Sequence, residues 1–121
     1  MPERGAARVT AAVCRASAGA VEHLPVAVVV NLARYLGEIK RGDLWVLAAE
    51  RSAATSLWAT DLAGGSALVF GAEGSGLRPG VRRACDDSLA IPLAGAVESL
   101  NVSVACGIVL FEAARQRRAR A

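Results

Sequence analysis

Four short apolar stretches, separated by polar or amphipathic segments, indicate an α/β fold. The stretches cover residues 26–30, 44–48, 67–70 and 89–93. Apolar runs of this length suit strands that are buried on both faces, as strands in parallel sheets are. Because segments with helical patterns lie between them, we expect a parallel sheet flanked by helices.

Capping residues mark the predicted helices between and after these strands. Asn31 can cap a helix that Gly42 would stop, and Thr55 or Ser56 can cap a shorter helix ending near residue 62. Residues 100–118 are predicted to form one long helix.

Length and composition describe a single globular domain. The chain has 121 residues, of which 54% are hydrophobic and 21% charged, so it is not of the disordered class. Its longest apolar runs are about six residues, whereas a bilayer span needs ~18. The first ten residues carry both signs of charge and no apolar signal-peptide core. We therefore expect a cytoplasmic protein.

Cysteine and histidine give no sign of a metal site. The 3 cysteines are odd in number and widely spaced, without a CxxC pair, so neither a disulfide framework nor a zinc site is indicated. The single histidine, His23, precedes Leu-Pro in a predicted turn, where a structural role is the more common one. No Ser-His-Asp arrangement emerges from the sequence.

Much of the excess positive charge, which gives a net charge of +3, lies near the C-terminus, in four arginines: Arg115, Arg117, Arg118 and Arg120. Such a cluster can bind nucleic-acid phosphates, or it can be a solvated helix end whose cations complement the helix dipole. A general RNA-binding module is disfavoured. The chain has only 2 Trp, 1 Tyr and 2 Phe, and we expect most of them in the core.

A glycine-rich loop, GAEGSG at residues 71–76, directly follows the third predicted strand. Its glycines allow close approach to a ligand and positive φ angles. The spacing matches neither a dinucleotide-binding fingerprint nor a phosphate-binding P-loop. The loop is either a tight turn or a ligand-binding segment. Glu73 favours the second, because a carboxylate between glycines is better suited to accept hydrogen bonds from a ligand or an arginine.

Two further segments, IPLAG at residues 91–95 and ESLNVSVA at 98–105, complete the candidate site. The first can flank an adenine ring, although an ordinary strand with an edge proline explains it equally well. In the second, Ser99 can cap the last helix, and Asn101 lies in its first turn, where it can face a pocket. The apolar stripe Val104, Ile108 and Phe111 is typical of core packing.

Together these residues resemble the TrmH/SpoU branch of the SPOUT methyltransferases, which use S-adenosylmethionine to methylate a ribose 2′-hydroxyl in RNA. Residues 68–76 resemble the second motif of that family, and residues 91–105 the third. Residues 16–26 and 31–34 resemble the subgroup that methylates a guanosine of 23S ribosomal RNA. The resemblance implies a methyltransferase domain over residues 16–118, after an N-terminal segment of uncertain structure (1–15) and before a short tail (119–121).

The resemblance also implies a fold, a site and a partner. The family fold is a parallel α/β sheet with a C-terminal trefoil knot that holds the cofactor, and its members are usually homodimers. Carried over, the cofactor-binding residues are Gly71, Gly74, Ile91, Leu93 and Leu100, and the active-site residues are Glu73, Ser99 and Asn101. The reaction requires that a 2′-hydroxyl lose its proton while it attacks the methyl group. Ser99 and Asn101 suit positioning, and Glu73 suits orienting a cation.

One family element has no counterpart in this sequence. The first motif carries an asparagine and an arginine about thirty residues upstream of residue 16, and the arginine is thought to assist deprotonation. We therefore expect a sheet that lacks its first strand. Two alternatives to the ribosomal RNA methyltransferase stay open. One is methylation of a tRNA ribose, and the other is a non-catalytic remnant that binds cofactor or dimerises.

Overall fold

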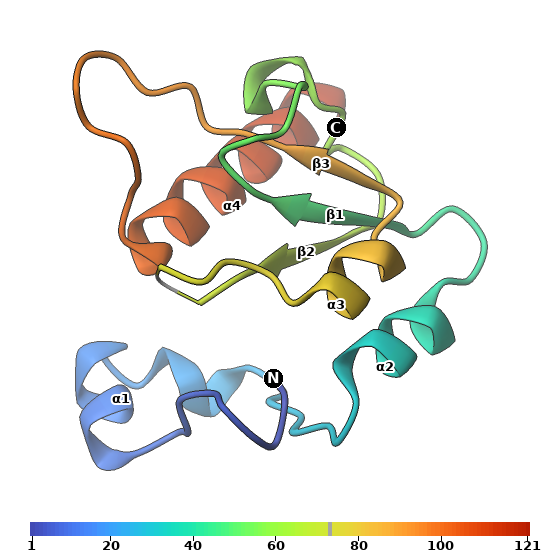
Figure 1. Ribbon diagram of the computed structural model, residues 1–121. Coiled ribbons are helices and arrows are strands. Elements are labelled where there is room, and N and C mark those ends of the chain that lie inside the picture. The colour runs from blue at the N-terminus through green and yellow to red at the C-terminus, as the bar shows by residue number, and fades with distance from the viewer. Residues whose placement is uncertain (73) are drawn as a thin grey trace.

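A three-stranded parallel sheet forms the centre of the protein, which we describe from a computed structural model covering residues 1–72 and 74–121 (Figure 1). The strands are β1 (Trp45–Ala49), β2 (Ser66–Phe70) and β3 (Asp87–Leu89), in the order β2-β1-β3. In the register, Leu47 of β1 lies opposite Leu68 of β2 and Asp87 of β3. The central strand is accordingly the one with the most buried residues.

Helices cover both faces of this sheet. Alternate β1 side chains point to opposite faces. Val46 and Ala48 pack in one core with residues of α2 (Leu32–Ile39) and α3 (Pro79–Ala84). Leu47 packs in a second core with residues of the 3-10 helix η2 (Leu57–Ala59) and of α4 (Val102–Arg120). The predicted fold class, a parallel sheet flanked by helices, is therefore confirmed.

The N-terminal elements stand apart from the sheet, as Figure 1 shows in blue. They are α1 (Ala11–Ala16) and the 3-10 helix η1 (Ala20–His23), and neither contains a buried residue. The first residues run beside Val29: Glu3 N donates to the Val29 carbonyl at 2.8 Å, and Val29 N donates to the Met1 carbonyl at 2.9 Å.

The prediction of a buried strand over residues 26–30 was wrong. The segment forms only a bridge between Val29 and Pro2, and Val26, Val28 and Val30 are 46%, 52% and 85% exposed. A β-branched run shows that a segment favours extended structure and burial, but it does not say which neighbour buries it. Here the run lies outside the three-stranded sheet.

Two other predicted strands were confirmed within one residue, as β1 and β2. The strand predicted over residues 89–93 was misplaced, because β3 ends at Leu89. The next residue, Ala90, bonds to both sides of the start of η2: its N–H donates to the Thr55 carbonyl at 2.9 Å, and its carbonyl accepts from Leu57 N at 2.7 Å. Ile91 and Leu93 therefore lie in a loop and line the cleft described below.

The helix predicted after Ser56 is shorter than expected. Ser56 caps it, with its hydroxyl accepting from Trp58 N at 3.2 Å, but η2 ends at Ala59. It stops before Leu62, whose N–H donates instead to the side chain of Gln116 on α4 at 2.8 Å.

The expectation that most aromatic residues lie in the core was also wrong. Trp45 is 58% exposed, Trp58 is 59% exposed and Phe111 is 80% exposed. No helix in the described part of the chain is long and apolar enough to cross a bilayer. The trefoil knot and the absent first strand stay predictions.

Candidate functional site

A cleft of about 1120 Å³ lies at the carboxyl end of the sheet, where loops from all three strands meet. Ligands of open α/β sheets bind at this edge. The lining comes from the ends of the strands, from the loops that follow them and from the start of α4: residues 49–52, 70–72, 74–77, 89, 91, 93, 98–102 and 105.

This cleft brings together nearly all of the site residues predicted from the sequence. The seven that line it are Gly71, Gly74, Ile91, Leu93, Ser99, Leu100 and Asn101. Glu73, the eighth, lies outside the described residues. Residues of the second and third motifs thus share one cavity, although 14 residues separate the two motifs in the sequence.

The glycine-rich loop closes tightly on itself beside the end of β2. Ala72 N donates to the Gly76 carbonyl at 3.2 Å, and Gly76 N donates to the Ala72 carbonyl at 3.0 Å. A Cβ at Gly71 would lie 2.6 Å from the Gly76 carbonyl oxygen, which is too close for any side chain. Gly74 and Gly76 have φ angles of +82° and +68°, a region that glycine tolerates best. The loop therefore presents backbone, and not side chains, to the cleft at these positions.

Two charged residues at the end of β1 were missed by the sequence analysis. Glu50 and Arg51 follow the strand directly and line the cleft. Glu50 forms an ion pair with Arg82 of α3, and Arg51 lies 3.5 Å from the carboxylate of Glu98 in the segment before α4. A usable signal was present, because polar residues immediately after a parallel strand lie at the ligand-binding edge of the sheet.

The last helix begins at the cleft. Asn101, and not Ser99 as predicted, is its N-cap: the Asn101 Oδ1 accepts from Ser103 N at 2.9 Å and from the Ser103 hydroxyl. Ser99 therefore precedes the helix and lies in the cleft wall. Because the amino end of a helix carries partial positive charge, α4 favours negative charge and hydrogen-bond acceptors here.

Of the apolar stripe predicted on this helix, Ile108 packs against the core, where it is partly buried, and Val104 and Phe111 do not. Val104 is 50% exposed and Phe111 is 80% exposed, whereas Val109 and Ala113 are buried. The two buried residues are four positions apart and so share a helix face. They pack against the sheet with Leu57 and Leu89, which leaves Val104 and Phe111 at the surface.

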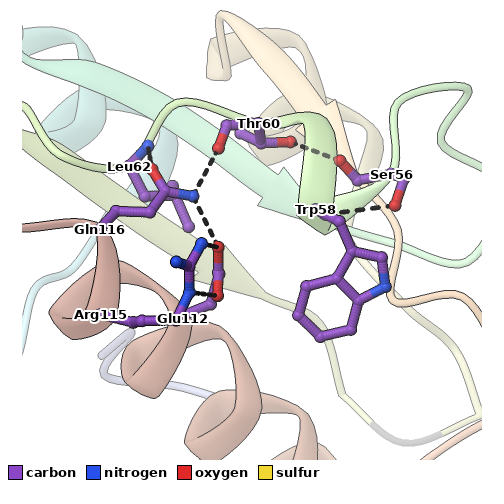
Figure 2. A network of polar contacts seen from close by, with 7 residues as sticks. All are labelled: Ser56, Trp58, Thr60, Leu62, Glu112, Arg115 and Gln116. Atoms are coloured by element: carbon purple, nitrogen blue, oxygen red, sulfur yellow. Dashed lines mark hydrogen bonds and ion pairs between the residues drawn. The ribbon is translucent and has the colours of Figure 1, made fainter. Parts of the chain in front are cut away.

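At its other end, α4 is fixed to the η2 region by the network shown in Figure 2. The Gln116 side chain accepts from Leu62 N at 2.8 Å and donates to the Thr60 carbonyl at 2.9 Å. It also donates to Glu112 at 2.9 Å. These bonds satisfy backbone groups that η2 leaves unpaired, and they hold the helix that begins at the cleft.

The network also shifts the titration of Glu112, whose side chain is only 7% exposed. Both of its oxygens accept from Arg115, at 2.8 Å each. Hydrogen bonds from Arg115 and then Gln116 lower the pKa of Glu112 to about 2. The carboxylate is therefore ionised near neutral pH and acts in structure, away from the cleft.

Other pKa shifts are also structural in origin. A hydrogen bond from Lys40, followed by one from Val46 N, lowers the pKa of Asp86, which holds the start of β1. Burial raises the pKa of the Cys85 and Cys106 thiols. These two thiols therefore stay protonated near neutral pH and do not have the character of activated nucleophiles.

The fold and the cleft define an α/β protein with a ligand-sized cleft at the carboxyl edge of a parallel sheet. A model of the SpoU rRNA methylase family matches residues 1–111, and the chain belongs to that family.

Relatives of known name agree with this assignment. The chain is 52% identical over 119 residues to the 23S rRNA (guanosine-2'-O-)-methyltransferase RlmB of Burkholderia sp, covering 98% of the chain and 48% of that protein. It is 50% identical over 117 residues to the enzyme of the same name from Xylella fastidiosa (strain 9a5c), covering 97% and 47%. The chain thus spans about half the length of these relatives.

Solved structures share the fold. The SpoU methyltransferase AviRb from Streptomyces viridochromogenes, solved with AdoMet, has a TM-score of 0.88 at 24% identity, covering 98% of this chain and 49% of that one. The TrmH/SpoU tRNA modifying enzyme of A. aeolicus has a TM-score of 0.81 at 29% identity, covering 98% and 59%. The resemblance to the TrmH/SpoU branch is confirmed.

Proposed function

We propose that this chain forms the cofactor-binding and catalytic part of an S-adenosylmethionine-dependent RNA 2′-O-ribose methyltransferase that acts on a guanosine of 23S rRNA. The observation that carries the proposal is the cleft in which the second and third motifs meet at the carboxyl end of the sheet. The relatives at 52% and 50% identity support this substrate. A ribosomal RNA substrate implies a cytoplasmic protein.

The residues of the cleft fit S-adenosylmethionine. The volume of the cleft, about 1120 Å³, is ample for a ligand of this size. Gly71 and Gly74 present backbone groups that can hydrogen-bond to a polar ligand, while Ile91 and Leu93 offer an apolar wall that can flank adenine. Leu100 extends the wall toward α4. We assign cofactor binding to these five residues.

When bound, S-adenosylmethionine supplies an electrophilic methyl group. The chain's own part is to place the ribose: we assign this to Ser99 and Asn101, which lie together at the start of α4. Holding an oxygen in reacting position is worth several orders of magnitude in rate. Glu73 is assigned to orienting a cation. Arg51 is one cation of the cleft wall, where it is paired with Glu98.

Methyl transfer to defined RNAs tests this function and its alternatives. The protein is incubated with tritiated S-adenosylmethionine and either unmethylated 23S rRNA or tRNA, and the products are digested to nucleosides. We expect label in 2′-O-methylguanosine from 23S rRNA. Label confined to tRNA would support the sister activity. Saturable cofactor binding without transfer to either RNA would overturn the activity and leave a non-catalytic cofactor-binding protein.

We also propose that the protein is a homodimer. The surface of α4 carries Phe111 at 80% exposure and Val104 at 50%, and large exposed apolar groups favour association. Sedimentation equilibrium should give twice the chain mass. Replacing Phe111 with Asp should shift the equilibrium toward monomer, and an unchanged dimer would place the interface elsewhere.

A further inference from the structure

A second pocket, of about 330 Å³, lies between η2 and the carboxyl half of α4, away from the cleft. Its side chains include Trp58, Thr60, Asp61, Arg115, Gln116 and Arg120. An aromatic ring and two guanidinium groups thus share one surface. Nothing in the methyl-transfer site accounts for this combination.

The indole of Trp58 has no part in the core. The neighbouring residue, Leu57, is fully buried and anchors η2, whereas Trp58 is 59% exposed. In Figure 2 the contact drawn to Trp58 is the one between its backbone nitrogen and Ser56. The indole ring extends from η2 beside α4, and much of its apolar surface is exposed to solvent.

Two guanidinium groups, of Arg115 and Arg120, and the carboxylate of Asp61 lie around this indole. Arg115 is paired with Glu112, and Arg120 lies 3.2 Å from Asp61, yet both arginines remain more than 60% exposed. Glu112 is buried and is not among the residues that line the pocket, so the pocket presents two largely exposed guanidinium groups and one carboxylate, that of Asp61.

The pocket is built on a rigid support. Gln116 joins α4 to Leu62 N and the Thr60 carbonyl, and Arg117 donates to the Leu62 and Gly64 carbonyls at 3.4 and 3.1 Å. The η2 region and α4, which carry the indole and the arginines, are thereby joined to each other before any ligand arrives. Preorganisation of this kind lowers the entropic cost of binding.

We propose that this surface binds a single-stranded segment of RNA, with a base stacked on Trp58 and the adjoining phosphates on Arg115 and Arg120. Stacking on an aromatic ring combined with basic side chains is the chemistry by which proteins hold single strands. The inference rests on the proposed function and deepens it, since it adds a contact for the substrate strand. Ala105 in the cleft and Gln116 in this pocket lie roughly 16 Å apart along α4, so one strand can reach both.

The two tryptophans allow a direct test, because they are the only ones in the chain. Trp45→Phe leaves Trp58 as the sole emitter, and Trp58→Phe leaves Trp45, which is exposed to the same degree. Each variant is titrated with a ten-nucleotide single-stranded RNA without cofactor. We expect saturable quenching in the Trp45→Phe protein and little in the Trp58→Phe protein.

Affinity measurements with a labelled oligomer provide the second arm. Trp58→Ala should weaken binding on the order of tenfold. Arg120→Gln should reduce the slope of log affinity against log salt by about 0.7, the loss of one phosphate contact to a single strand. The matched control is Arg34→Gln, which removes an exposed arginine of α2, also in an ion pair, and should change neither quantity.

Three results would overturn the inference: equal quenching in both single-tryptophan proteins, unchanged affinity in Trp58→Ala, or a Trp58 emission shift with protein concentration alone. The last would show that the surface joins two protein chains. None of these readouts involves the cofactor or methyl transfer. Loss of transfer with intact Trp58 quenching would therefore refute the proposed function alone.

Discussion

Gly71 and Gly76 lie in direct backbone contact, so that a Cβ on Gly71 would come within 2.6 Å of the Gly76 carbonyl oxygen. The close approach joins the end of β2 to the far side of the glycine-rich loop. It fixes the shape of the cleft wall that we assign to the cofactor.

Gly71→Ala should therefore damage both stability and binding. Relief of the backbone clash must move the loop, and we expect a loss of about 1–3 kcal/mol in the free energy of unfolding. The affinity for S-adenosylmethionine should fall at least tenfold. Urea unfolding and calorimetry measure the two effects. The control is Gly37→Ala in α2, where a Cβ meets nothing within 4 Å. It should leave affinity unchanged and stabilise by up to ~1 kcal/mol.

Gln116 should contribute more to the free energy of unfolding than most polar side chains do. Gln116→Leu would leave Leu62 N and the Thr60 carbonyl without their partner, and we expect a loss of about 2 kcal/mol. The measurement is the urea-induced unfolding free energy. The control is Arg118→Ala, which removes an exposed side chain two positions after Gln116. This substitution should change the free energy of unfolding by less than ~0.5 kcal/mol. Equal effects of the two substitutions would contradict the role of the network.

Acid should destabilise the protein partly through Glu112. Its pKa in the folded protein, about 2, lies below its ordinary value of 4.5. The ionised group therefore stabilises the fold above pH 4.5, and this contribution is lost as the pH falls toward 2. Urea midpoints measured between pH 6 and pH 2 should fall less steeply in Glu112→Gln than in the unchanged protein. If the urea midpoints of the two proteins fall in parallel with pH, the contact with Arg115 does not stabilise the ionised form of Glu112.

Asn101 combines a structural and a proposed catalytic role, and two substitutions separate them. Asn101→Ala should lose the cap and about 1 kcal/mol of stability, together with methyl transfer. Asn101→Asp keeps a capping oxygen and should restore stability without restoring methyl transfer. The readouts are thermal unfolding and transfer of label to 23S rRNA. If Asp restores both, Asn101 acts only as a cap.

Local patterns in the sequence predicted the centre of this fold. Strands over residues 44–48 and 67–70 and the helix capped by Asn31 could be predicted, because periodicity and capping act within a few residues. The run at 26–30 failed because burial depends on a neighbour that the pattern does not specify. The exposure of Trp58 was missed for the same reason, since Leu57 beside it takes the core position.

The sequence predicted the part of the site that is formed by the second and third motifs. Seven of its residues share the cleft, although their roles stay predictions. The ion pairs of Glu50 with Arg82 and Arg51 with Glu98 join segments more than thirty positions apart. Such contacts are set by the packing of α3 and the loops on the sheet, and no local spacing records them.

Binding of the cofactor is the most direct test of the account. The purified chain is titrated with S-adenosylmethionine by isothermal calorimetry, with circular dichroism to establish that it is folded. We predict saturable binding at one site per chain, weakened in Gly71→Ala and unchanged in Trp58→Ala. A folded chain that shows no saturable heat would contradict the assignment of the cleft.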